Sequence, residues 1–285
     1  MTTNIPTVTL NNGVKMPQEG FGVYQIDDFD LCKQSVKDAL RVGYRAIDTA
    51  QGYHNEKAVG QAIAESDIDR SNIFLTTKVW ISNYGYEQTK KSVQESLTKL
   101  QTNYLDLVLL HQPFNDYYGA YRALEDLYQE GKIRAIGVSN FYADRYLDLV
   151  KFNKIIPAVN QLETHVFYQR TEERPYLDKY HTQLESWGPF AEGKNDFFTN
   201  PTLVEVGKKH NKTAAQVALR FLVQNGVVII PKSTHKKRMQ ENIDIWDFKL
   251  SSDEMHKIKQ LDTNKSLFFD HRDPKIVDAL TDLTV

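Results

Sequence analysis

Short apolar runs rich in β-branched residues alternate along the chain with longer segments whose apolar positions recur at a helical period. Eight of the short runs are typical of strands, at residues 20–24, 44–48, 73–79, 105–111, 133–139, 158–162, 183–187 and 227–231. Helical periods occupy the segments between them, including residues 28–42, 56–64, 87–100, 120–130, 143–152 and 213–224. Gly43, Gly131 and Gly226 stand where helices should stop, because glycine adopts the backbone conformation of a C-terminal cap.

Ahead of the first run, a hairpin is predicted around Asn11-Asn12-Gly13, because an Asn-Gly pair accepts the positive φ angles of a tight turn. Eight strands that are each followed by a helix are typical of a parallel barrel. The competing doubly wound sheet normally carries G-x-G-x-x-G in its first strand–helix turn, and the nearest match, at residues 20–25, lacks the third glycine. No linker-like segment divides the chain. The pattern therefore predicts an α/β fold, a (β/α)8 TIM barrel with an N-terminal β-hairpin, as a single domain over residues 1–285.

Composition narrows the class of protein. The 285 residues include 35 Lys and Arg against 37 Asp and Glu, a formal charge of −2, which argues against a nucleic-acid binder. The start of the chain does not resemble a secretory signal, and no run reaches the roughly 18–20 apolar residues of a membrane span. Cys32 has no second cysteine to pair with, so an internal disulfide and a cysteine zinc cluster are excluded. We expect a cytoplasmic protein that engages neither nucleic acid nor membrane.

Polar and aromatic side chains gather at the C-terminal ends of the predicted strands. They are Asp48, Lys78, His111, Ser139, Asn140, Gln161, Trp187 and Lys232. Taken singly, each has an ordinary explanation, such as a helix cap for an aspartate or a solvated end for a lysine. In a parallel barrel, however, these strand ends meet at one mouth, where active sites lie. We therefore expect these side chains to form one site.

Four residues of this region, Asp48, Tyr53, Lys78 and His111, together form a site that can donate a proton to a carbonyl. Tyr53 follows Asp48 by one short loop, and a nearby ammonium such as that of Lys78 lowers the pKa of a phenol. Asp48 can keep a buried Lys78 charged, and His111 can donate a hydrogen bond to a substrate oxygen. The set contains no nucleophile for acyl transfer. No metal is expected either, because the histidines are scattered and none forms His-x-His or His-Glu-x-x-His.

These residues lie in motifs that resemble the aldo-keto reductase family, in the same order and over essentially the whole chain. The motifs are Gly43-Tyr-Arg-Ala-Ile-Asp-Thr-Ala50 with Tyr53-His-Asn-Glu56, Thr76-Thr-Lys-Val-Trp80, Leu109-Leu-His-Gln-Pro113, Gly137-Val-Ser-Asn-Phe141, Asn160-Gln161 and Ile230-Pro-Lys-Ser233. The ending Ser266-Leu-Phe-Phe-Asp-His-Arg-Asp-Pro274 looks like the bacterial branch that resembles 2,5-diketo-gluconate reductases and reductases of glyoxal-type aldehydes.

The resemblance implies a function for each matching residue. Asp48, Tyr53, Lys78 and His111 match the catalytic tetrad, with Tyr53 as proton donor. Trp187 matches the aromatic residue on which nicotinamide stacks. The residues expected to hold the rest of NADPH are Gly22, Ser139, Asn140, Gln161, Gly188, Pro189, Lys232, Ser233, Thr234, Arg238, Glu241 and Asn242. Among these, Lys232, Ser233 and Arg238 match the residues around the 2′-phosphate, which favours NADPH over NADH.

The substrate pocket is expected to be built from loops. Tyr24, Trp80, His111 and Phe114 are its candidate residues. The segment from Gly188 to Lys194 resembles the loop that folds over the pyrophosphate of the cofactor. The expected function is NADPH-dependent reduction of small carbonyls, dicarbonyls or sugar-derived keto acids to alcohols, by a monomer. The alternative is an NADPH-binding sensor with little turnover, against which the complete tetrad argues.

Overall fold

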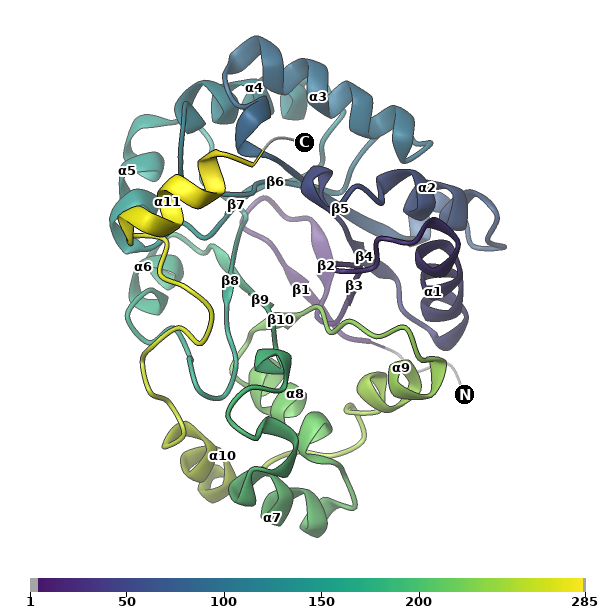
Figure 1. The fold of residues 1–285 in the computed structure, drawn as a ribbon, viewed down its shortest axis with the longest axis vertical. Helices are drawn as coiled ribbons and strands as arrows, with labels where there is room; N and C mark the ends of the chain where they lie inside the picture. Colours follow the sequence, from purple (N-terminus) through teal and green to yellow (C-terminus); the bar gives the residue numbers. More distant parts are fainter. Residues whose placement is uncertain (1–4, 284–285) are drawn as a thin grey trace.

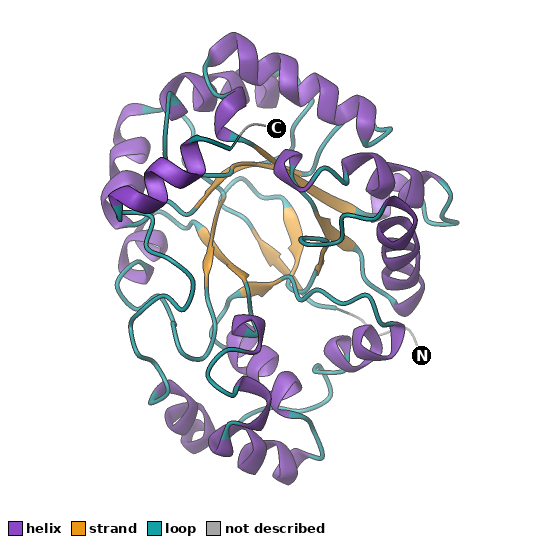
Figure 2. Ribbon diagram, in the orientation of Figure 1, coloured by secondary structure: helices purple, strands orange, loops and turns teal. Residues whose placement is uncertain are grey.

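The computed structural model describes residues 5–283 and shows a ring of strands surrounded by helices (Figures 1 and 2). The strands are β1 (Thr7–Thr9), β2 (Lys15–Pro17), β3 (Phe21–Gly22), β4 (Ala46–Asp48), β5 (Phe74–Val79), β6 (Leu107–Leu110), β7 (Ile136–Ser139), β8 (Val159–Glu163), β9 (Gln183–Trp187) and β10 (Val228–Ile229). The α-helices are α1 (Phe29–Val42), α2 (Glu56–Ala64), α3 (Tyr86–Lys99), α4 (Tyr117–Gln129), α5 (Ala143–Phe152), α6 (Arg174–Lys179), α7 (Pro201–His210), α8 (Ala214–Gln224), α9 (Lys236–Ile243), α10 (Ser252–Lys259) and α11 (Pro274–Thr281).

The main sheet contains eight parallel strands in the order β10-β9-β8-β7-β6-β5-β4-β3, so that neighbours in sequence are also neighbours in space. A parallel bridge between Glu19 and Ile229 joins the first strand region to the last. The backbone N–H of Gly20 donates to the carbonyl of Ile229 at 2.8 Å in the same junction. The ring of strands therefore closes, and the predicted (β/α)8 barrel is confirmed.

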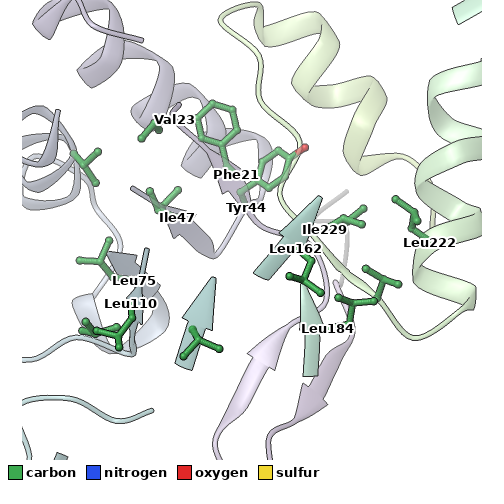
Figure 3. Close-up of a cluster of buried hydrophobic side chains, with 14 of the residues drawn as sticks. Phe21, Val23, Tyr44, Ile47, Leu75, Leu110, Leu162, Leu184, Leu222 and Ile229 are labelled. Carbon is green, nitrogen blue, oxygen red and sulfur yellow. The ribbon is translucent and has the colours of Figure 1, made fainter. Parts of the chain in front are cut away.

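Alternation along the strands separates two apolar cores. In β6, Val108 and Leu110 belong to the large cluster between the strands and the helices, part of which is seen in Figure 3. Leu107 and Leu109 belong to a smaller cluster that also contains Ala46 and residues of other strands. Because successive side chains of a strand point to opposite faces, the first pair faces the helices and the second faces the barrel interior.

The predicted N-terminal hairpin closes the end of the barrel at which the parallel strands begin. Its strands β1 and β2 are antiparallel, and Gly13 at the turn has a φ of 85°. Leu10 and Met16 are buried in the interior cluster. Asn11 Nδ2 donates to the carbonyl of Pro157 at 3.0 Å, just before β8 begins. The opposite end of the barrel is thus the one left open for a site.

The helix ends follow the residues that the pattern identified. Asp28 caps α1, its side chain accepting from the N–H of Leu31, and Gly43 ends the same helix with a φ of 129°. Gly131 and Gly226 lie just after α4 and α8, each with a φ of 73°. These positive φ values strain any residue with a Cβ, which explains the glycines.

Five helices lie outside the segments that the sequence pattern singled out, namely α6, α7, α9, α10 and α11. Two of them show why such patterns fail. The helix α6 has six residues, too short for a helical period to emerge. The helix α11 has eight residues and no fully buried one, although Val277 and Leu280 pack against the core. A helix of six to eight residues therefore offers too few turns for a clear helical period.

Candidate active site

A cavity of about 860 Å³ opens at the C-terminal ends of the strands. The predicted site residues reach it because they lie two positions beyond residues of the interior core. Such pairs are Ala46 and Asp48, Leu109 and His111, and Val159 and Gln161. The period of a strand therefore points all three polar side chains inward, above the apolar layer.

The Lys78 ammonium is the centre of the predicted tetrad. Its Nζ donates to Asp48 Oδ1 at 2.5 Å, to the Thr49 carbonyl at 3.0 Å and to Tyr53 Oη at 3.2 Å. Lys78 is fully buried and Asp48 is nearly so. Burial lowers the pKa of Lys78, but the neighbouring Asp48 and Tyr53 raise it, and the net pKa lies above its usual value. The lysine is therefore held as a cation.

The pKa of the Tyr53 phenol differs from the sequence-based expectation that Lys78 lowers it. Lys78 lowers its pKa, as expected from the sequence, but burial is the larger effect. Burial, aided by the negative charge of Asp48, raises the pKa of Tyr53 to about 12. The phenol is therefore neutral at pH 7 and carries the proton that a donor requires.

His111 lies against Tyr53 with its ring centroid 5.6 Å away and its plane tilted by 76°. Burial, followed by the charge of Lys78, holds the pKa of His111 well below its usual range. Among residues 5–283, its Nδ1 atom has no hydrogen-bond partner. A neutral imidazole beside Tyr53 can donate one hydrogen bond to an oxygen in the cavity without adding charge.

Next to the tetrad, the predicted nicotinamide residues form a connected group. Trp187 Nε1 donates to Asn140 Oδ1 at 2.9 Å, and Asn140 Nδ2 lies 3.2 Å from Ser139 Oγ. The Trp187 ring contacts Phe268 edge-on, at 5.2 Å between centroids. All of these residues and Gln161 line the cavity. An aromatic face beside amide and hydroxyl groups suits a flat ring that carries a carboxamide.

The rest of the predicted cofactor residues continue from this cavity into a second one of about 430 Å³. Phe190, Phe198, Lys232 and Arg238 line both cavities. Gly22, Gly188 and Pro189 line the first, and Ser233, Thr234, Glu241 and Asn242 line the second. Every residue predicted to hold the cofactor thus lines one of two cavities that share four lining residues, which are together called the groove below.

Cations and hydroxyls at the far end of this groove suit a phosphate. Lys232 and Arg238 are exposed, and Ser233 Oγ accepts from the N–H of His235, which precedes α9. The first turn of α9 contributes unpaired N–H groups and a partial positive charge. An arginine can hold a phosphate by two parallel hydrogen bonds. The donor set therefore fits a dinucleotide with an additional phosphate.

The loop after β9 has an unusual backbone. Gly188, Ala191, Glu192 and Gly193 all have positive φ values, between 50° and 79°. Two of the four are not glycines, so this segment holds a conformation that L-residues rarely adopt. Because Phe190 and Glu192 line the cavity, a change in this loop would alter access to the groove.

Of the four predicted substrate residues, Tyr24, Trp80 and His111 line the cavity. Phe114 lies outside this lining and is buried against His271, with ring centroids 6.3 Å apart. The sequence did not identify several further lining residues. They are Gln25, Gly52, His54, Gln112, Phe190, Glu192, Phe198, Ile230, Phe269, Leu280 and Leu283.

The two leucines lie near the C-terminus, and Trp80 Nε1 donates to the Leu283 carbonyl at 2.8 Å. No local motif marks Leu283, because its carbonyl meets Trp80 through a hydrogen bond across 203 positions.

Two negative findings apply to residues 5–283. No group of three or more His, Cys, Asp or Glu side chains is arranged to hold a metal ion. No helix of this part of the chain combines the length and apolar character needed to cross a membrane.

Comparison with known proteins agrees with this geometry. A model of the "Aldo/keto reductase family" matches residues 20–263. The chain is 46% identical over 260 residues to a protein named glyoxal reductase from Bacillus subtilis, covering 91% of this chain and 94% of that protein.

Solved structures are similar as well. An aldo-keto reductase from a deep-sea metagenome superposes with a TM-score of 0.90 and 41% identity, covering 93% of this chain and 98% of that one. A Bombyx mori aldo-keto reductase in complex with NADP superposes with a TM-score of 0.86 and 33% identity, covering 92% and 94%. The resemblance noted in the sequence is therefore confirmed: the chain belongs to the aldo/keto reductase family and is an oxidoreductase of carbonyl groups.

Proposed function

We propose that this protein is an NADPH-dependent reductase of small, uncharged aldehydes, ketones and dicarbonyls. The observation that carries the proposal is the chain of contacts from Tyr53 through Lys78 to Asp48 beside the Trp187–Asn140 pair. A proton donor and a surface for a nicotinamide ring thus share one cavity. The B. subtilis relative named glyoxal reductase and the NADP complex of the Bombyx mori protein support the same activity.

The groove residues provide places for each part of NADPH. Trp187 offers its ring face, while Asn140 and Gln161 offer amide groups for the carboxamide. Lys232 and Arg238 offer the cations for the 2′-phosphate. When bound, the cofactor supplies a hydride to the carbonyl carbon of the substrate.

The protein residues manage the proton and the developing charge. Tyr53 holds a proton at Oη and transfers it to the carbonyl oxygen as negative charge builds there. Lys78, kept charged by Asp48, stabilises the phenolate that this transfer leaves behind. Neutral His111 donates to the same oxygen and fixes the direction of the carbonyl. Trp80 and Tyr24 form aromatic walls.

The charges around the cavity favour uncharged substrates over keto acids. Among the described lining residues, the lysines and arginines are Lys232 and Arg238, and both also line the second cavity. Glu192 adds a carboxylate to the lining. A substrate carboxylate would therefore lose water without gaining a cationic partner.

The test is NADPH oxidation, followed by absorbance, with a panel of aldehydes and dicarbonyls. A matched pair, 4-carboxybenzaldehyde and its methyl ester, checks the substrate charge. We expect turnover of the panel and a preference for the ester of about tenfold or more in kcat/KM. NADPH binding without turnover of any carbonyl would instead support the sensor function, and a preference for the acid would contradict the argument from charge.

We also infer that the chain acts as one domain and as a monomer. The Glu19–Ile229 bridge joins distant parts of the chain, and Leu283 completes the cavity within the same chain. Light scattering after size-exclusion chromatography measures the mass in solution, and a dimer would contradict the inference.

A further inference from the structure

A third buried acid lies beside the catalytic ion pair. Glu185 is the middle residue of β9, two positions before Trp187, and is 1% exposed. Its backbone pairs in register with Gln161 of β8. This carboxyl group has no direct part in the proposed mechanism. Its burial nevertheless costs free energy, because the group loses its contacts with water.

Glu185 and Asp48 share one partner, the side-chain amide of Gln161. Gln161 Nε2 donates to Glu185 Oε2 at 2.9 Å and to Asp48 Oδ2 at 3.1 Å. A primary amide nitrogen has two hydrogens, so these two acceptors use both. The polar atom that Gln161 has left for a ligand is therefore its carbonyl oxygen, Oε1, and Gln161 lines the cavity.

The two acids also hold the amide in place. Rotating the amide by half a turn would bring its carbonyl oxygen against the negative charge of Asp48, where oxygen atoms repel one another. With Asp48 alone, the amide nitrogen would keep one partner but could pivot about that contact. Two acceptors on one nitrogen fix both the direction and the plane of the amide.

The same contacts reach the proton donor. Asp48 accepts from Gln161 with Oδ2 and from Lys78 with Oδ1, and Lys78 donates to Tyr53. A continuous set of hydrogen bonds therefore runs from Glu185 to the phenol. Any movement of Gln161 would disturb the oxygen of Asp48 that it shares.

The surroundings of Glu185 keep its carboxyl group uncharged near neutral pH. The charged groups that face it are Asp48 and Lys78. The other residues around it, from β2, β4, β5 and β10 and the ends of neighbouring segments, are mainly apolar. Burial, followed by the charge of Asp48, raises the pKa of Glu185 to about 8, while Gln161 and Lys78 lower it. Glu185 can thus accept from Gln161 without adding a full negative charge beside the catalytic pair.

We propose that Glu185 is a positioning residue for the nicotinamide end of the cofactor. Together with Asp48, it holds the Gln161 amide so that Oε1 accepts from the carboxamide NH2 group. The inference rests on the proposed function, because it requires a nicotinamide in this cavity. It assigns the recognition of the carboxamide to the pair Glu185–Gln161 rather than to Gln161 alone.

The experiment compares binding of NADP+ with binding of its 3-acetylpyridine analogue, whose acetyl group lacks the NH2 donor. Quenching of tryptophan fluorescence measures both affinities without turnover. We expect wild type to favour NADP+ by about tenfold, within the range of one hydrogen bond. Glu185→Leu should reduce this preference to about twofold, because it leaves one Gln161 N–H unpaired.

Control variants and a control ligand separate positioning from general damage. Glu185→Gln keeps an acceptor for Gln161 and should retain the preference for NADP+. Adenosine 2′,5′-bisphosphate, which lacks the nicotinamide, should bind wild type and Glu185→Leu equally. Gln161→Leu should abolish the preference, and adding Glu185→Leu to it should change nothing further. If Glu185→Leu does not fold, Glu185→Ser serves in its place, since its side chain is too short to reach Gln161.

A full tenfold preference in folded Glu185→Leu would overturn the inference. Equal weakening of the dinucleotides and of adenosine 2′,5′-bisphosphate would also overturn it, because the effect would then be structural. Failure of the wild-type protein to bind NADP+ and to reduce any carbonyl would refute the proposed function itself. That result is measured on wild type alone and is therefore distinct from the outcomes for the variants.

Discussion

Replacing Glu19 by glutamine should remove a large part of the decrease in stability as the pH rises from acid to alkaline. Glu19 is fully buried at the junction that closes the barrel, where it accepts from Trp246 Nε1 at 3.0 Å and lies 3.2 Å from Tyr44 Oη. Tyr44 has one hydroxyl proton, and the Met239 carbonyl is a second acceptor at 3.3 Å. A protonated Glu19 resolves this competition by donating to Tyr44 while Tyr44 donates to Met239.

The magnitude follows from the pKa. Burial is the largest effect and raises the pKa of Glu19 from 4.5 to about 8, although both hydrogen bonds lower it. Between these values the folded state keeps a proton that the unfolded state has released, so the free energy of unfolding falls as pH rises. The slope is about 1.4 kcal/mol per pH unit, which sums to at most about 5 kcal/mol over the window. Below pH 4.5 Glu19 does not lower the free energy of unfolding, and above about pH 8 its full effect is reached.

Urea unfolding at pH values of about 5.5, 7 and 8.5 measures the effect. The free energy of unfolding of Glu19→Gln minus that of wild type should increase by about 3 kcal/mol from pH 5.5 to pH 8.5. Its amide can donate to Tyr44 and accept from Trp246, so the folded contacts are kept. Glu87→Gln, at an exposed glutamate, is the matched control and should run parallel to wild type. Parallel curves for wild type and Glu19→Gln would refute the reasoning.

Three further predictions concern the catalytic and cofactor residues. Tyr53→Phe removes the proton and should reduce carbonyl turnover by about 10²–10⁴-fold while NADPH affinity stays unchanged; retained turnover would contradict its assignment as proton donor. Asp48→Asn leaves the buried Lys78 ammonium without its carboxylate and should lower the free energy of unfolding by about 3–5 kcal/mol in urea titrations, so a wild-type value would argue against a charged lysine. Arg238→Ala should weaken NADPH binding by about tenfold or more relative to NADH binding, and equal losses for both would remove Arg238 from the phosphate site.

Much of the fold could be predicted from the sequence because the signals are local. The eight strand runs, the helix-ending Gly43 and the hairpin at Gly13 depend on periodicity and on backbone conformation within a few residues. Local signals blur at element ends, which explains why the run 105–111 contains a strand only over Leu107–Leu110. The placement of Asp48 and His111 at the mouth also followed, since the C-terminal ends of the strands meet there in a parallel barrel.

Other features of the site depend on which distant segments meet. The pKa of Tyr53 could not be inferred from the presence of Lys78, because the depth of burial outweighs the neighbouring charge. Phe114 was a candidate for the substrate pocket as an aromatic residue of a loop, yet it packs against His271 from the far end of the chain.

The amino-acid sequence by itself thus determined the barrel, its helix ends and the gathering of Asp48, Lys78 and His111 at one mouth. These features follow from short-range periodicity and from residues, such as glycine, that favour a local backbone conformation. The tertiary structure decided that Glu185 shares the Gln161 amide with Asp48 and that Leu283 reaches Trp80. Those contacts join strands and loops that are remote in sequence, and electrostatic effects at such points depend on distance and burial, which arise only when the ring of strands closes.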